Sequence, residues 1–112
     1  MTIIDDLNLI LNTKLSPIEI DEGGRKRTVS ITDQKLFLLA TLSFEPYTFD
    51  EFVTKKRFNE LTQLSERFVS RASTALESVG LIKSEKKGST FRFTVLISAI
   101  ERLGKKQGSN EQ

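Results

Sequence analysis

The chain has 112 residues, of which 38% are apolar and 29% are charged, so its length supports one domain with a modest core. It contains neither cysteine nor histidine, which excludes disulfide bonds, thiolate and imidazole catalysis, and zinc sites built from these ligands. The formal net charge is +2, from 17 basic and 15 acidic side chains.

This small net charge hides an uneven distribution. Residues 1–24 carry five acidic side chains and one basic one, a net charge of −4. Residues 25–112 carry 16 basic and 10 acidic side chains, a net charge of +6. Within them, residues 55–92 have a net charge of +5. The C-terminal two-thirds of the chain is therefore basic, and this asymmetry is more informative than the total.

No segment has the sequence features of a signal peptide or of a membrane-spanning helix. Asp5 and Asp6 stand where a signal peptide needs positive charge. The longest uninterrupted apolar run, residues 36–40, is far below the ~18 residues that a spanning helix requires. We therefore expect a soluble, cytoplasmic protein with no membrane partner, associated with the nucleoid if it binds DNA.

The first 31 residues are predicted to form a helix and a hairpin that extend the main domain. Four apolar residues recur at helical spacing and predict an amphipathic helix over residues 2–13: Ile3, Leu7, Ile10 and Leu11. Two alternating runs then lie on either side of Gly23 and Gly24, with Ile18 and Ile20 before them and Val29 and Ile31 after them. Such a pattern predicts a β-hairpin.

Three helices are predicted next. The first starts at Thr32, is ended by Pro46, and has an apolar stripe of Leu36, Leu39, Ala40 and Phe44. Thr48-Phe49-Asp50-Glu51 matches a capping box, so we expect the second helix to begin there, with Phe49, Phe52 and Val53 facing inward. Lys55, Lys56 and Arg57 would then lie in its last turn, where cations suit the helix dipole.

The third helix is capped by Thr62 or Ser65 and ends before Gly80, which favours a left-handed C-terminal cap. Its predicted buried stripe is Leu64, Phe68, Ala72, Ala75, Leu76 and Val79.

Two strands are predicted to follow the third helix, at residues 81–85 and 90–95, joined by a turn over residues 86–89. Residues 96–103 predict a short final helix, and residues 104–112 a disordered tail.

The third helix and the strands after it resemble the recognition helix and wing of winged helix-turn-helix DNA-binding domains. The residues that carry the likeness are Ser-Glu-Arg-Phe-Val-Ser-Arg-Ala-Ser-Thr-Ala-Leu-Glu-Ser-Val-Gly-Leu-Ile at 65–82, then residues 83–88, and Phe91-Arg92-Phe93. In that superfamily a Leu-Glu-x-x-Gly-Leu-Ile ending joins the recognition helix to the wing. The resemblance implies an α+β winged helix over residues 32–103, with a three-helix helix-turn-helix core, a β-hairpin wing and an N-terminal extension over residues 1–31.

The resemblance also implies duplex DNA as the partner, with the third helix in the major groove and the wing on the DNA backbone. Helical periodicity places the candidate groove contacts on the exposed side of this helix: Arg67, Ser70, Arg71 and Thr74. Arginine is the side chain that most often hydrogen-bonds to guanine, and a hydroxyl can hydrogen-bond to either a base or a phosphate. Glu66 and Glu77, on the same side, are unfavourable near phosphate.

Two further groups are candidates for phosphate contacts, which position a protein on DNA without specifying sequence. The candidates on the wing are Lys83, Lys86, Lys87, Ser89 and Arg92. Lys55, Lys56 and Arg57 can add contacts from the predicted end of the second helix, or can serve only to complement its dipole. Arg25, Lys26 and Arg27 are either a DNA-contacting arm or the solvated end of a hairpin, and we favour the second interpretation.

The sequence gives less support for base stacking, metal binding or catalysis. Phe91 and Phe93 could stack on bases, but their alternation with Arg92 and Thr94 favours a place in the core. The carboxylates Asp5, Asp6, Asp21 and Glu22 lack a recognisable ligand spacing, so we expect no metal or cofactor. Without histidine, cysteine or a glycine-rich phosphate loop, we expect no enzyme and no catalytic residues.

We therefore expect a small transcriptional regulator that binds duplex DNA. The alternative is a winged-helix protein–protein interaction module of a replication or transcription assembly, since fold does not settle function. A non-specific architectural binder is a third hypothesis. A homodimer could match two half-sites, through the stripe near the N-terminus or through Leu96, Ile100 and Leu103, although both stripes could equally pack on their own domain.

Overall fold

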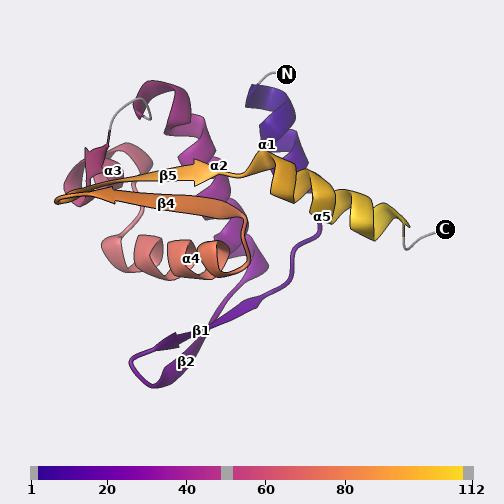
Figure 1. Ribbon diagram of the computed structural model, residues 1–112, viewed down its shortest axis with the longest axis horizontal. Coiled ribbons are helices and arrows are strands. Elements are labelled where there is room, and N and C mark those ends of the chain that lie inside the picture. The colour runs from indigo at the N-terminus through magenta and orange to yellow at the C-terminus, as the bar shows by residue number, and fades with distance from the viewer. Residues whose placement is uncertain (1–2, 49–51, 110–112) are drawn as a thin grey trace.

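The computed structural model describes residues 3–48 and 52–109, with side chains over residues 4–43 and 52–103. Over these residues the chain is a mixed α+β protein with five helices and two small antiparallel sheets (Figure 1). The first sheet is the hairpin β1–β2, and the second has the strand order β3-β5-β4.

The N-terminal extension contains the predicted helix and hairpin. Helix α1 spans Ile3–Asn12, and the strands β1 (Ile18–Glu22) and β2 (Arg25–Val29) follow. The two loop residues, Gly23 and Gly24, have φ angles of 62° and 88°. Two positive φ values are typical of a type I′ turn, which glycine adopts without steric cost. The Asp21 carboxylate accepts a 2.9 Å hydrogen bond from the Gly24 N–H and fixes this turn.

Helix α2 (Ile31–Thr48) begins earlier and ends later than predicted. The Ser30 hydroxyl accepts a 3.1 Å hydrogen bond from the Asp33 N–H, as a helix N-cap does, so Ile31 belongs to the helix and not to the hairpin. The prediction that Pro46 ends this helix is also wrong. Proline removes one N–H donor, and in the last turn that loss does not stop the helix.

The buried side of α2 differs from the predicted stripe. Phe37 and Leu38 are fully buried, whereas Leu36 is 46% exposed. Leu39 and Ala40 are half-buried, and the side chain of Phe44 lies outside the described residues. Because α2 contacts α1, α3, α4 and β5, it needs apolar residues on several sides, and a single-stripe pattern misplaces the core.

The start of the next helix also differs from the prediction. Strand β3 (Val53–Thr54) pairs with β5, and helix α3 (Lys55–Thr62) begins directly after it. The Thr54 hydroxyl accepts a 3.1 Å hydrogen bond from the Arg57 N–H and caps the helix. Thr48 is therefore the last residue of α2 and not an N-cap, while residues 49–51 of the predicted capping box lie outside the described residues.

Helix α4 (Glu66–Ser78) lies where predicted, but its buried side includes Val69, which was not predicted, and the predicted Phe68 is only half-buried. The Ser65 hydroxyl accepts a 3.1 Å hydrogen bond from the Phe68 N–H, which makes Ser65 the N-cap. The fully buried side chains of the helix are Val69, Ala72, Ala75 and Leu76. Val79, predicted in the buried stripe, is 50% exposed because the helix ends at Ser78. Gly80 has a φ of 77° and turns the chain toward the sheet.

The strands β4 (Ile82–Lys87) and β5 (Thr90–Val95) form a hairpin whose inner face packs on the helices. Four phenylalanines meet there: Phe37, Phe58, Phe91 and Phe93. The ring centroids of Phe91 and Phe93 are 4.8 Å apart, and the ring of Phe58 lies 5.5 Å from each of them. The prediction that Phe91 and Phe93 are core residues is confirmed, since less than a tenth of each is exposed.

Helix α5 (Ile97–Ser109) continues beyond the predicted end of the final helix. Its backbone is helical over residues 104–109, where the sequence predicted a disordered tail, and Lys105, Lys106 and Gln107 are good helix formers. Residues 110–112 lie outside the described residues.

Ile100 of α5 and Ile10 of α1 are each only 1% exposed, so both predicted dimerisation stripes bury residues within their own chain. None of the helices described is both long and apolar enough to cross a bilayer.

Candidate nucleic-acid interface

Helix α4 lies between two hairpins, with β4–β5 along one side and β1–β2 along the other (Figure 1). The contact with β1–β2 is apolar, because Ile20 and Val29 pack against Ala75, which is fully buried. The buried amide of Gln34 holds the base of the same hairpin, donating hydrogen bonds of 3.1 Å to the Val29 carbonyl and 2.8 Å to the Ser16 carbonyl. The N-terminal extension therefore has a fixed position beside α4.

The side chains on the exposed side of α4 change from basic on one edge, through hydroxyls in the middle, to acidic on the other edge. Ser70 and Thr74 lie along the middle, because successive helical residues turn by about 100°. Arg67 and Arg71 lie on the edge toward β1–β2 and line a cleft there. Glu66 and Glu77 lie on the edge toward β4–β5 and line a second groove, which Ser70 and Thr74 also border. The predicted groove contacts are thus on one exposed side, but the arginines and hydroxyls face different hollows.

Arg71 has a partner that sequence reasoning missed. Its Nε and Nη2 atoms donate hydrogen bonds of 2.9 Å and 3.1 Å to the two carboxylate oxygens of Glu22 in β1. These hydrogen bonds hold the pKa of the Glu22 carboxyl below its ordinary value of 4.5, and the charges of Arg71, Arg27 and Arg67 lower this pKa further. The same hydrogen bonds raise the pKa of Arg71. In this structure Arg71 joins α4 to β1–β2.

The cleft between α4 and β1–β2 is basic. It has a volume of about 500 Å³ and is bordered by four cationic residues, Lys26, Arg27, Arg67 and Arg71. Among its described lining residues Asp33 is the acidic one, and Thr28 and Ser65 add hydroxyls. The Arg27 Nε lies 3.8 Å from the Glu22 carboxylate. This arrangement suits an anionic group.

The groove between α4 and β4–β5 is more acidic. It has a volume of about 420 Å³ and is bordered by Glu66, Glu77 and Glu85, together with Lys55 and Lys86. The Lys55 ammonium lies 3.7 Å from the Glu66 carboxylate, and Glu77 accepts a 3.2 Å hydrogen bond from the Ser84 N–H. The carboxylates therefore offset the cations of this groove.

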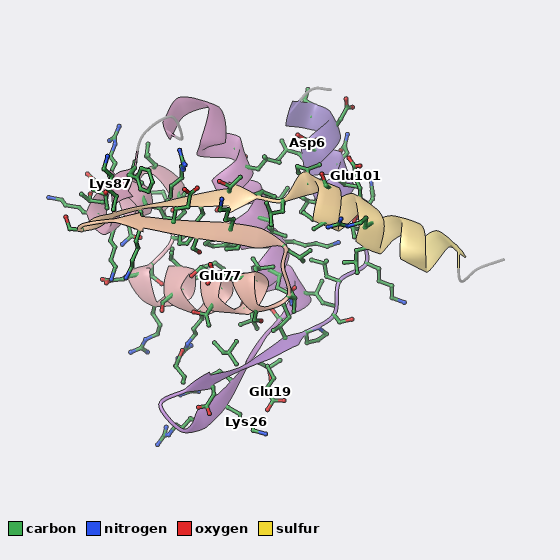
Figure 2. All side chains as sticks on the ribbon, in the orientation of Figure 1. Asp6, Glu19, Lys26, Glu77, Lys87 and Glu101 are labelled. Carbon is green, nitrogen blue, oxygen red and sulfur yellow. The ribbon has the colours of Figure 1, made fainter. Side chains whose placement is uncertain are left out.

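The predicted wing contacts lie on two faces of the β4–β5 hairpin. The register pairs Lys86 with Phe91, so Lys86 is on the face turned toward the core and α4. Lys83, Lys87 and Arg92 are on the opposite face, although Lys87 is also next to the tip of the hairpin (Figure 2). Ser89 is exposed in the tip, beside Gly88 with its φ of 63°. Strand alternation alone could have revealed this division.

Arg92 has contacts within its own sheet. Its Nη2 donates a 2.9 Å hydrogen bond to the Glu85 carboxylate on the paired strand, and its guanidinium lies 4.7 Å from the centre of the Phe52 ring. The side chain is 27% exposed. Arg92 therefore stabilises the outer face of the sheet, and it does not lie in the tip of the hairpin.

Lys55, Lys56 and Arg57 occupy the first turn of α3, and the prediction that they lie in a last turn is wrong. The physical reason is the pairing of β3 with β5, which delays the start of the helix. Cations at a helix N-terminus add to the positive end of the dipole, so this turn has an enhanced positive potential. Lys56 and Arg57 are exposed there.

The acidic residues near the N-terminus have structural roles. Asp21 holds the β1–β2 turn and Glu22 pairs with Arg71, while no group of three acidic side chains in the described part of the chain is arranged to hold a metal ion.

Comparisons with family models, with curated proteins and with solved structures found no match.

Proposed function

We propose that the protein binds duplex DNA and that α4 enters the major groove. The observation that carries this proposal is the exposed side of α4, where Arg67, Ser70 and Thr74 stand between two hairpins. The major groove of B-DNA, about 12 Å wide, admits one α-helix and presents a base-specific pattern of donors and acceptors. Arginine and hydroxyl side chains suit that pattern.

The order of elements supports the winged helix-turn-helix interpretation of residues 32–103. Helices α2, α3 and α4 are followed by the β4–β5 hairpin, and the short strand β3 joins the same sheet. On this interpretation α3 lies across the DNA backbone and α4 reads the bases. Lys86 and Lys87 near the hairpin tip, and Lys56 and Arg57 in the first turn of α3, then contribute phosphate contacts. We further propose a role in transcription regulation, which sequence-selective binding would support.

Fluorescence anisotropy with a labelled random-sequence duplex tests DNA binding. We expect binding at low salt and about tenfold weaker binding for Lys86→Gln/Lys87→Gln, because two phosphate contacts are lost. The matched control is Lys14→Gln/Arg102→Gln, which removes the same charge from two exposed positions that are not among the candidate DNA contacts. Absence of wild-type binding at low salt, or equal losses in both variants, contradicts the proposal. Competition with unrelated DNA separates a regulator from an architectural binder.

The acidic groove favours one other candidate function. Glu66 and Glu77 beside α4 repel phosphate but suit a basic segment of a protein partner. An interaction module is therefore our second proposal. It predicts no duplex binding at low salt, together with binding of Lys- and Arg-rich peptides that Glu66→Gln/Glu77→Gln weakens. Peptide binding that this variant does not change contradicts it.

Dimerisation stays a prediction. On α1, Ile4 and Leu11 remain exposed by 64% and 52%, while Ile10 is buried within the chain. Sedimentation velocity tests whether the protein pairs to match two half-sites. A strict monomer at high protein concentration contradicts a homodimer.

A further inference from the structure

The two sides of α4 differ in their attraction for phosphate. Toward β1–β2, the cleft is bordered by four cations, and the carboxylates near them are Asp33, Glu22 and Glu19. Toward β4–β5, Lys55 and Lys86 face Glu66 and Glu77, while Glu85 is paired with Arg92 on the outer face of the sheet. A DNA backbone carries one negative charge per phosphate, and its binding strength depends on the cations that replace condensed counterions. The backbone next to α4 is therefore favoured on the β1–β2 side.

The hairpin β1–β2 presents its cations from a fixed position. Register pairs Ile18 with Val29, Ile20 with Arg27, and Glu22 with Arg25, so these six residues share one face. The apolar end of this face packs on α4 through Ile20 and Val29, which places Arg27 beside the helix. Lys26, on the other face, lies beside Glu19 (Figure 2), with its ammonium 3.6 Å from the Glu19 carboxylate. Lys26 is also among the residues that border the cleft. A fixed hairpin loses little entropy on binding.

Glu22 shows which chemical group the arginines favour. Arg71 binds both of its carboxylate oxygens, Arg27 lies 3.8 Å away, and the charge of Arg67 also lowers the Glu22 pKa. Paired donors of this kind recognise carboxylate and phosphate in the same geometry. The four cations of the cleft meet three carboxylates, Asp33, Glu22 and Glu19, so one net positive charge is left for a second anion.

We infer that the cleft between β1–β2 and α4 is a binding site for the phosphodiester backbone of duplex DNA, with Lys26 and Arg27 as its contacts. The hairpin β1–β2 then contacts the DNA backbone on one side of α4, and the hairpin β4–β5 contacts it on the other side. This inference rests on the proposed DNA binding and assigns a function to the N-terminal extension.

The salt dependence of binding tests this site. We expect Lys26→Gln/Arg27→Gln to bind random-sequence duplex about tenfold more weakly at low salt, and to reduce the slope of log K against log salt by about 2. Lys14→Gln/Arg102→Gln is again the charge-matched control and should leave the slope near the wild-type value. Circular dichroism and thermal unfolding verify that each variant is folded.

Glu22→Gln gives a readout that misfolding cannot imitate. Removal of this carboxylate frees Arg71 and raises the positive potential of the cleft, so we expect DNA binding to become several-fold tighter. Glu101→Gln, which removes one negative charge from α5, is the matched control and should change affinity less.

The outcomes separate this inference from the proposed function. No duplex binding by the wild-type protein overturns both. Wild-type binding that Lys26→Gln/Arg27→Gln weakens no more than the control does overturns the phosphate site alone. Weaker binding by the hairpin variant together with tighter binding by Glu22→Gln supports the site. Tighter binding by Glu22→Gln that Glu101→Gln matches overturns it, because net charge then explains the gain.

Discussion

Arg71 and Glu22 join α4 to β1–β2 across 49 residues of sequence. Helical periodicity correctly predicted that Arg67, Ser70 and Thr74 are exposed, since that property depends on local spacing alone. It could not predict the partner of Arg71, because that contact depends on how two distant elements pack. Sequence reasoning therefore predicted the exposed side of α4, including Glu66 and Glu77, but missed the pairing of Glu22 with Arg71.

The Arg71–Glu22 pair makes stability depend on pH in a defined direction. The pKa of Glu22 is lowered in the folded protein, so its contribution to stability is fully present above the unfolded value near 4.5. It is lost as the pH falls through the lower folded-state pKa. We predict that Glu22→Gln reduces the loss of thermal stability between pH 7 and pH 3, measured by circular dichroism. An unchanged loss contradicts a stabilising pair.

A second residue-scale prediction concerns the buried side of α2. Leu38 is 1% exposed and Leu36 is 46% exposed, although the predicted stripe contained Leu36. We expect Leu38→Ala to lower the free energy of unfolding by about 2–5 kcal/mol, the usual cost of a truncated core leucine. Leu36→Ala should cost less than about 1 kcal/mol. Urea denaturation measures both, and equal losses would contradict this orientation of the helix.

At the scale of elements, prediction succeeded where the signals were local. The Gly-Gly turn, the Ser65 cap and the Gly80 helix end all depend on neighbouring residues, and each has the predicted role. The start of α3 was misplaced because Val53 and Thr54 pair with Thr90 and Phe91, residues far along the chain. Strand pairing thus overrode a plausible helix signal.

The true start of α3 can be tested at its cap. Thr54 accepts the Arg57 N–H, so Thr54→Ala should lower the free energy of unfolding by about 0.5–2 kcal/mol. Thr54→Ser keeps the hydroxyl and should restore most of this loss. Urea denaturation provides the measurement. If serine destabilises as much as alanine does, the hydroxyl is not the cap.

The whole molecule is flat, with extents of 47 × 39 × 21 Å, and α4 lies between its two hairpins (Figure 1). The sequence predicted the α+β class and both hairpins from local patterns. It did not predict that β1–β2 packs on α4, because Ile20, Val29 and Ala75 meet only in the folded chain. This packing brings the basic strand β2 to the helix that we propose enters DNA.

The salt dependence of duplex binding by the wild-type protein tests most directly whether this surface binds DNA through its phosphates. Anisotropy titrations from low to near-physiological salt give log K against log salt for a random-sequence duplex. If the six proposed contacts, Lys26, Arg27, Lys56, Arg57, Lys86 and Lys87, each meet one phosphate, log K should fall linearly with log salt at a slope of about −5. No binding at the lowest salt, or a slope near zero, would show that this surface does not bind DNA through its phosphates.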